Sequence, residues 1–182
     1  MKAKVSKTIV MVGMMGAGKT AVGKALAAAL GIPFIDSDQE IEKAANMTIA
    51  EIFARDGEPF FRKKESQVID RLLAGPPCIL SAGGGAYVDP ANRKMISERA
   101  VAVWLNADLE VLWNRVRHKT TRPLLKAANP KQVLSDLLDK RIPTYAQAEI
   151  AVRAEPAYSI EDTTGAVIEA LRQRPDVVEF SE

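Results

Sequence analysis

One stretch near the N-terminus, residues 13–20 (GMMGAGKT), constrains the fold of this chain more than any other feature. It matches the pattern G-x-x-x-x-G-K-[ST] at every fixed position. The apolar run at residues 8–12 predicts a buried strand before it, and the alanine- and leucine-rich run at residues 19–30 predicts a helix after it. The pattern in this setting predicts a loop that binds phosphate, called the phosphate loop below.

Each part of the phosphate loop has a physical role. Glycines let the backbone curl so that its N–H groups point at a phosphate, and the N-terminus of the following helix adds partial positive charge. Lys19 can reach the β- and γ-phosphates, and Thr20 can offer its hydroxyl to Mg²⁺. We therefore expect a nucleoside triphosphate to bind at eight residues: Gly13, Met14, Met15, Gly16, Ala17, Gly18, Lys19 and Thr20.

Length and composition narrow the class of protein. A chain of 182 residues suits one domain with a full core, so we expect residues 1–182 to form a single domain. The formal net charge of +2 gives no reason to expect nucleic acid or an anionic membrane as partner. The single cysteine, Cys78, allows no internal disulfide, which favours a cytoplasmic location. The apolar N-terminal stretch is the phosphate loop itself, which argues against a signal peptide.

Short apolar runs alternate with longer helical patterns along the chain. The predicted strands are residues 8–12, 33–35, 78–81, 101–105 and 150–152. The predicted helices are residues 19–30, 38–45, 49–55, 60–74, 92–98, 108–118, 130–140 and 159–173. This alternation, with a phosphate loop after the first strand, predicts a doubly wound α/β domain. The tail, residues 174–182, is expected to be loose or disordered.

Two carboxylates on alternate residues, Asp36 and Asp38, follow the second predicted strand. In such a pair one carboxylate can hold a metal-bound water while the other accepts a proton from a substrate hydroxyl. Taken alone, a helix N-cap at Asp36 or Ser37 is the simpler explanation, but beside a phosphate loop we favour the catalytic one. Ligands gather at the carboxyl ends of parallel strands, so this turn should share a cleft with the phosphate loop.

A triglycine loop, Gly83, Gly84 and Gly85, follows the third predicted strand. Glycines are entropically costly to order, so three together suit a place where a ligand lies against bare backbone. A merely flexible loop is the alternative. The triglycine loop lies at the same edge of the predicted sheet as the phosphate loop, and its N–H groups could bind substrate oxygens.

Arginines provide candidate anion sites. Arg62 and Arg141 could each hold a carboxylate through two parallel hydrogen bonds, although most helix arginines are only solvated. Glu65, three residues after Arg62, could orient it. The basic segment at residues 115–122 is expected to lead into a mobile lid over ATP.

In their order along the chain, these pieces resemble the shikimate kinases, small P-loop kinases of aromatic amino-acid biosynthesis. The resemblance runs from about residue 8 to residue 171. Its pieces are residues 13–20, Asp36-Ser37-Asp38, Glu51-Ile52-Phe53, Gly57-Glu58, Phe61-Arg62, Gly83-Gly84-Gly85, Arg122-Pro123-Leu124-Leu125 and Arg141-x-Pro143-x-Tyr145. The chain departs from the family at Asn46, where glycine is common, but asparagine also suits a left-handed turn.

The resemblance implies a three-layer P-loop NTPase fold like that of nucleoside monophosphate kinases. It would hold a five-stranded parallel sheet in the order 2-3-1-4-5, a substrate-binding helical region at about residues 37–65 and a lid at about residues 116–130. The implied reaction moves the γ-phosphoryl group of ATP to the 3-hydroxyl of shikimate, giving ADP and shikimate 3-phosphate, with Mg²⁺ as cofactor. The implied protein is a cytoplasmic monomer that binds neither membrane nor nucleic acid.

The resemblance also implies the catalytic and metal-binding residues. Lys19, Asp38 and Arg122 would be catalytic, with Lys19 and Arg122 on the transferring phosphoryl group and Asp38 on the substrate hydroxyl. Thr20 would ligate Mg²⁺, and Asp36 would support it through a water.

The remaining contacts of ATP and shikimate follow from the same resemblance. Arg115 and Arg122 would bind ATP, with Arg115 against adenine, and Pro156 is a weaker match for a second adenine contact. The implied shikimate contacts are Asp38, Arg62, Gly83, Gly84, Gly85 and Arg141.

Three other functions stay open. Gluconate also has a carboxylate and several hydroxyls, so the arginines alone do not separate a gluconate kinase from a shikimate kinase. A nucleotide switch is less consistent with the sequence, because Asp162-Thr163-Thr164-Gly165 spells D-x-x-G near the C-terminus but no N-K-x-D follows anywhere. A homologue without turnover is disfavoured by the intact set of charged residues.

Overall fold

A computed structural model describes residues 1–118 and 127–182 of the chain. Five parallel strands form the main sheet, in the order β3-β4-β2-β5-β6. The strands are β2 (Thr8–Val12), β3 (Phe34–Asp36), β4 (Ile79–Ser81), β5 (Ala100–Asn106) and β6 (Ile150–Arg153). Counted among themselves along the chain, they stand in the order 2-3-1-4-5, which confirms the predicted topology.

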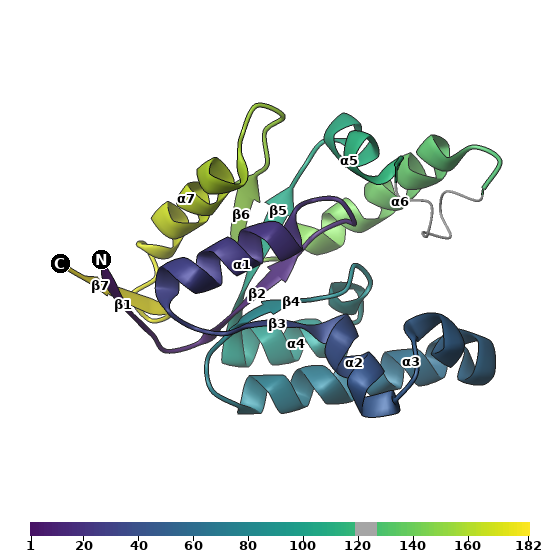
Figure 1. Cartoon of the computed structure of the whole chain (residues 1–182), viewed down its shortest axis with the longest axis horizontal. Helices are drawn as coiled ribbons and strands as arrows, with labels where there is room; N and C mark the ends of the chain where they lie inside the picture. Colours follow the sequence, from purple (N-terminus) through teal and green to yellow (C-terminus); the bar gives the residue numbers. More distant parts are fainter. Residues whose placement is uncertain (119–126) are drawn as a thin grey trace.

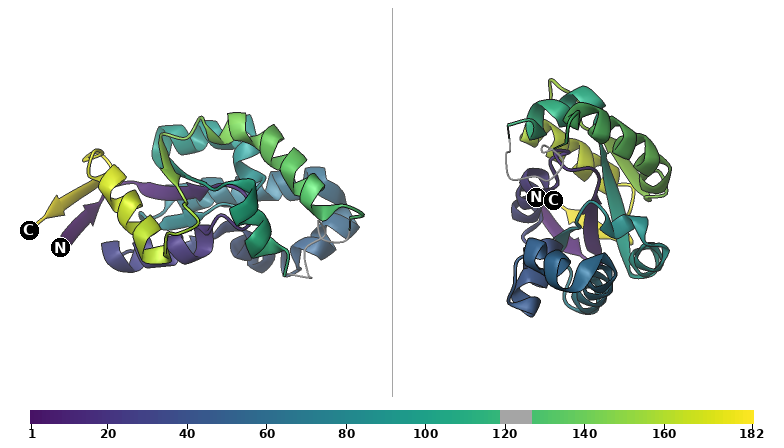
Figure 2. Two further views of the ribbon diagram at one scale, coloured as in Figure 1. Left: turned by 90° about the horizontal axis from the view of Figure 1, so that it is seen from above. Right: turned by 90° about the vertical axis from the view of Figure 1, so that its right-hand side faces the viewer.

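Helices cover both faces of this sheet. They are α1 (Lys19–Leu30), α2 (Ser37–Ala45), α3 (Ile49–Ala74), α4 (Pro90–Arg99), α5 (Leu109–Val116), α6 (Pro130–Tyr145) and α7 (Ile160–Leu171), with a short 3₁₀ helix η1 (Ala86–Val88). Figure 2 shows α1 and α7 on one face of the sheet and α4 and α6 on the other, which gives the three predicted layers. Within the described ranges, no helix is both long and apolar enough to cross a membrane.

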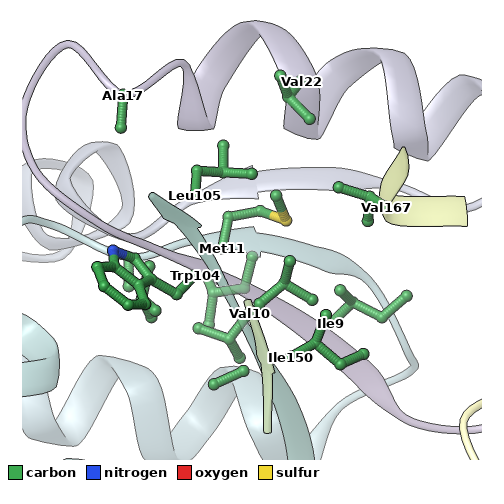
Figure 3. Close-up of a cluster of buried hydrophobic side chains, with 14 of the residues drawn as sticks. Ile9, Val10, Met11, Ala17, Val22, Trp104, Leu105, Ile150 and Val167 are labelled. Carbon is green, nitrogen blue, oxygen red and sulfur yellow. The ribbon is translucent and has the colours of Figure 1, made fainter. Parts of the chain in front are cut away.

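The core lies on both faces of the two central strands. Every residue of β2 is buried, and so is every residue of β5 except Asn106. Strands that helices cover on both faces consist of nearly continuous apolar residues, and this pattern is why the sequence predicted β2 and β5. Figure 3 shows part of this core, with Met11 of β2 and Leu105 of β5 beside Val22 of α1.

Local capping signals set the ends of the helices near the cleft. Asn46 ends α2 in the left-handed conformation with φ 51°, as expected for asparagine in place of glycine. Thr48 then caps α3 by accepting a hydrogen bond from the N–H of Glu51 at 3.2 Å. The two helices predicted at residues 49–55 and 60–74 are joined into α3, which is kinked at Gly57 (φ 80°, ψ 171°).

A second, two-stranded sheet corrects the sequence-based expectation for the C-terminus. The tail forms β7 (Val178–Ser181), which pairs antiparallel with β1 (Lys2–Val5), a strand that the sequence analysis did not predict. Val177 and Val178 are buried, so the tail is fixed to the body of the protein. Its partner is more than 170 residues away in sequence, which no local pattern reports. The termini lie together, away from the phosphate loop (Figure 1).

Candidate active site

A cleft of about 650 Å³ opens at the carboxyl ends of β2, β3 and β4. The phosphate loop lines one side of it, Asp36 and Asp38 line another, and the start of the triglycine loop closes the third. Arg115 of α5 completes the lining on the nucleotide side. The three loops that the sequence placed at one edge of the sheet thus meet in one cleft.

Glycine conformations and one lysine shape the phosphate loop. Gly13, Gly16 and Gly18 have φ of 145°, 83° and 100°, values that a residue with a side chain rarely adopts. Any side chain on Gly16 would also lie 2.8 Å from Val116. The Nζ of Lys19 donates to the carbonyl of Gly13 at 2.7 Å, so the lysine spans the loop that it closes.

The phosphate loop is anchored from behind by two apolar side chains. Met14 and Ala17 are each 2% exposed and belong to the main core. A phosphate can therefore reach these two residues only through their backbone. Thr20, in contrast, is exposed on the first turn of α1 and lines the cleft.

The turn after β3 holds two carboxylates in different roles. Asp36 Oδ1 accepts the N–H groups of Asp38 at 2.9 Å and of Gln39 at 3.2 Å, so Asp36 is the N-cap of α2. Burial raises the pKa of Asp38 above its ordinary value, and the neighbouring Asp36 raises it further, against the opposing charges of Lys19 and Arg62. Asp36 therefore caps α2 and also lines the cleft, and its hydrogen bond fixes the backbone of Asp38 at the start of that helix.

The triglycine loop packs directly on the charged side chains of the acceptor side. A methyl group added to any of its residues would meet one of them: on Gly83, Asp38 Oδ1 at 2.7 Å; on Gly84, Arg141 Nη1 at 3.0 Å; on Gly85, Arg62 Nη1 at 2.7 Å. A side chain on any of these glycines would thus have to displace a charged group from its place against the loop. Asp38, Arg62 and Arg141 come from α2, α3 and α6, and this loop brings them together.

Glu65 orients Arg62, as the spacing of the two residues predicted. Arg62 Nη1 donates to Glu65 Oε1 at 2.9 Å, and the Glu65 side chain is 1% exposed. Burial raises the pKa of Glu65, while the hydrogen bond and charge of Arg62 lower it. Glu58, one turn earlier and exposed, lies 3.5 Å from Arg62 Nε.

Three buried polar side chains at the triglycine loop and the residue after it were missed as site residues. Ser37 Oγ accepts the N–H of Gly83 at 3.2 Å, and Asn92 Nδ2 donates at 2.9 Å to the carbonyl of Ala86, the first residue of η1. Tyr145 donates its hydroxyl to the carbonyl of Gly84 at 2.6 Å. Ser37 and Tyr145 stood inside motifs recognised in the sequence, but Asn92 carried no local signal.

Of the remaining predicted nucleotide contacts, Arg115 lies at the phosphate loop, Pro156 lies in a separate turn, and Arg122 is not described. Arg115 Nη1 donates to the carbonyl of Gly16 at 2.9 Å and so lies at the phosphate loop. Pro156 lies exposed in the turn between β6 and α7. Arg153 ends β6 and pairs with Asp108 at 2.7 Å and Glu155 at 2.9 Å. Arg122 and much of the predicted lid lie outside the described residues.

The cleft offers oxygen ligands that suit Mg²⁺. In residues 1–118 and 127–182, no group of three or more His, Cys, Asp or Glu side chains is arranged to hold a metal ion. Mg²⁺ needs no such cage, because it keeps several waters and binds through one or two protein oxygens and substrate phosphates. Thr20 and Asp36, both in the lining of the cleft, fit that ligand set.

The cleft joins a phosphate loop to Asp38 and to the triglycine loop, against which Arg62 and Arg141 pack. This arrangement defines a P-loop kinase of a small molecule. The sequence profile of the family described as shikimate kinase matches residues 15–172. The chain therefore belongs to the shikimate kinase family.

Individual relatives agree with this assignment. The shikimate kinase of Cereibacter sphaeroides is 63% identical over 180 residues, which are 99% of this chain and 90% of the relative. Among solved structures, shikimate kinase from Acinetobacter baumannii in complex with shikimate is 36% identical, with a TM-score of 0.85 over 92% of this chain and 93% of that chain. A gluconokinase from Sinorhizobium meliloti, 22% identical with a TM-score of 0.62 over 95% and 96%, shares the fold alone.

Proposed function

We propose that this chain, as a shikimate kinase, transfers the γ-phosphoryl group of ATP to the 3-hydroxyl of shikimate in the cleft described above. The products are ADP and shikimate 3-phosphate. The observation that carries the proposal is the convergence of Asp38, Arg62 and Arg141 on the triglycine loop, which lines the same cleft as Lys19. Asp38 could accept a hydrogen bond from a substrate hydroxyl, and the two arginines could bind a substrate carboxylate. Shikimate, a cyclic carboxylic acid with several hydroxyls, has both groups.

The acceptor side would bind shikimate by its carboxylate and its hydroxyls. Arg62 and Arg141 would hold the carboxylate through charge-assisted hydrogen bonds, and backbone N–H groups of residues 83–85 would contact the ring substituents. Asp38 would accept a hydrogen bond from the reacting hydroxyl. Its raised pKa supports a role as proton acceptor, because a base works best when its pKa is closer to the working pH.

The nucleotide side would hold and neutralise the phosphates. Lys19 and Arg122 would place positive charge on the transferring group, where negative charge is spread in the transition state. Mg²⁺, when bound, neutralises the β- and γ-phosphate oxygens, and Thr20 with Asp36 through a water would hold it. Arg115, hydrogen-bonded to Gly16, would cover the adenine side.

The less direct expectations are part of the same proposal. Pro156 would flank adenine, residues 37–65 would form the substrate-binding region, and residues 116–130 would form the lid of a single domain. The near-balanced charge of +2 supports a protein that binds neither membrane nor nucleic acid, and the single cysteine supports a cytoplasmic location. The monomer is part of the proposal through the family resemblance. Light scattering of the purified protein tests the monomer, and a mass of two or more chains contradicts it.

A coupled assay of ADP release with two acceptors tests the function. Shikimate should support turnover, and gluconate should not, although both carry a carboxylate and hydroxyls. Turnover with gluconate and none with shikimate would refute the proposal. Calorimetry with ATP and GTP separates a kinase from a nucleotide switch, since a switch of the GTPase kind should prefer GTP.

A further inference from the structure

We propose that Tyr145 is a positioning residue for shikimate, whose hydroxyl holds the Gly84 peptide and the Arg141 guanidinium in one fixed arrangement. The proposal rests on the proposed function, because it concerns how the acceptor side of that same cleft is built. Tyr145 is the last residue of α6, and Arg141 lies one turn earlier on the same helix. The two side chains therefore lie on the same helix face.

The Tyr145 hydroxyl bridges two elements that are far apart in sequence. It donates to the carbonyl of Gly84 at 2.6 Å, across 61 residues of chain. Arg141 lies at the same glycine, because a methyl group added to Gly84 would lie 3.0 Å from Arg141 Nη1, and its positive charge acts on the Tyr145 hydroxyl. The hydroxyl of Tyr145 and the guanidinium of Arg141 thus both lie against Gly84 of the triglycine loop.

The surroundings keep this hydroxyl in place and protonated. Tyr145 is 0% exposed, and its ring centroid lies 6.1 Å from that of Trp104 on β5. Burial raises the pKa of Tyr145, although the charge and hydrogen bond of Arg141 oppose this. The group therefore remains an O–H donor near neutral pH. Because the side chain is rigidly packed against the sheet, it ties the loop to the core.

The hydrogen bond to Gly84 also orients a candidate substrate donor. The described part of the chain contains no cis peptide bond. The Gly84 carbonyl and the Gly85 N–H therefore lie in one peptide plane and point in opposite directions within it. Holding the carbonyl of Gly84 therefore sets the direction of the Gly85 N–H. Glycine loses more conformational freedom on ordering than any other residue, so a free triglycine loop would bind substrate weakly.

The substitution Tyr145→Phe removes this hydroxyl and keeps the ring. We expect the shikimate Kd from calorimetry, and the shikimate KM, to rise about tenfold, since the carbonyl of Gly84 loses its donor beside Arg141. The ATP KM and kcat should change less than about twofold, because the nucleotide side is untouched. The control is Tyr87→Phe, a second buried tyrosine, 3% exposed, in η1. It should leave the shikimate Kd unchanged.

A double-mutant cycle tests whether Tyr145 acts through Arg141. In the background of Arg141→Ala, adding Tyr145→Phe should raise the shikimate Kd by clearly less than it does alone, because the two side chains act together. Multiplicative effects of the two substitutions would overturn the proposal.

Four other results also decide the matter. An unchanged shikimate Kd in Tyr145→Phe, with wild-type protein that binds and phosphorylates shikimate, would overturn this inference and leave the proposed function standing. Equal loss of affinity in Tyr145→Phe and Tyr87→Phe, or equal losses for shikimate and ATP, would overturn it as a general loosening of the fold. Wild-type protein that fails to bind shikimate would overturn the proposed function itself.

Discussion

Arg62 and Glu65 form an ion pair in which the carboxylate is almost completely buried and the guanidinium is partly exposed beside Gly85. The N···O distance is 2.9 Å, and the two side chains are 31% and 1% exposed. A buried carboxylate costs desolvation, which the charge and hydrogen bond of its partner offset. Glu65 therefore holds the Arg62 guanidinium in one orientation, with part of its donor edge free for an anionic ligand from the cleft.

Substitutions of this pair should weaken shikimate binding selectively. Arg62→Ala should raise the shikimate Kd by about 10- to 100-fold, the range for losing a hydrogen bond to a charged group. Glu65→Gln, which keeps the shape but not the charge, should give a smaller rise. The control Arg71→Ala removes an exposed arginine of α3 that pairs with Glu40, and it should change neither ligand. Calorimetry with shikimate and ATP measures both; equal losses for the two ligands would undo the anion-clamp assignment.

Asp38→Asn should remove activity and stabilise the fold. Turnover should fall by about 10²- to 10⁴-fold, the usual contribution of general acid–base catalysis. Burial raises the pKa of Asp38 in the folded state, which means that its ionised form is less stable there than in the unfolded chain. Asparagine carries no such charge, so the variant should have the higher unfolding midpoint near neutral pH.

The stability gain of Asp38→Asn should depend on pH in a defined direction. A folded-state pKa above the unfolded value means that stability is fully present below the ordinary pKa of 3.8 and is lost as pH rises through the folded pKa. The difference in unfolding midpoint between variant and wild type should therefore be largest at neutral pH and vanish on acidification below 3.8. Thermal scans at several pH values measure it. A gain that grows toward acid pH would contradict the raised pKa.

Lys19→Ala should lower turnover more than substrate affinity. Its charge is worth most when negative charge spreads over the transferring phosphoryl group, so kcat should fall about 10²- to 10³-fold. The shikimate KM should change little, because the acceptor side is intact. Lys24→Ala, on the same helix but over the Phe34 ring, is the matched control and should retain kcat. Steady-state kinetics of both variants decide it, and wild-type turnover in Lys19→Ala would remove Lys19 from the mechanism.

Gly85→Ala should damage the shikimate site although its backbone angles are ordinary. Gly85 has φ −91° and ψ −9°, which alanine tolerates, but its new methyl group would push into the Arg62 guanidinium. We expect the shikimate KM to rise about tenfold or more with little change in the ATP KM. Gly165→Ala is the control, since nothing lies within 4 Å of its added methyl group. In the exposed interior of α7 it should stabilise the protein by about 0.5–1 kcal/mol and leave activity unchanged.

The variants Gly85→Ala and Gly165→Ala are each measured for activity and for stability. Shikimate KM values come from the coupled assay, and unfolding midpoints come from denaturant titrations. A normal KM in Gly85→Ala would mean that Arg62 is free to move aside without loss, which contradicts its fixed position against the loop. Loss of activity in Gly165→Ala would show that helix α7 affects the cleft in a way that these contacts do not explain.

Much of the fold could be predicted because its signals are local. The buried strand at residues 8–12 and the helix at residues 19–30 agree with β2 and α1 to the residue, since apolar runs and capping glycines act within a few positions. The pairing of β1 with β7 was missed because four-residue strands of mixed burial carry little periodicity. The prediction of separate helices at residues 49–55 and 60–74 agrees with the non-helical angles of Gly57, which interrupt α3 between them.

The sequence by itself determined the phosphate loop, the strand and helix on either side of it, and which charged residue types were available for an acceptor. Those features follow from backbone conformation and hydrophobic burial, which depend on neighbours in the chain. Only the tertiary structure decided that the triglycine loop packs on Asp38, Arg62 and Arg141, and that Tyr145 ties Gly84 to Arg141. These contacts join segments dozens of residues apart, so they exist only once the sheet and its helices have packed.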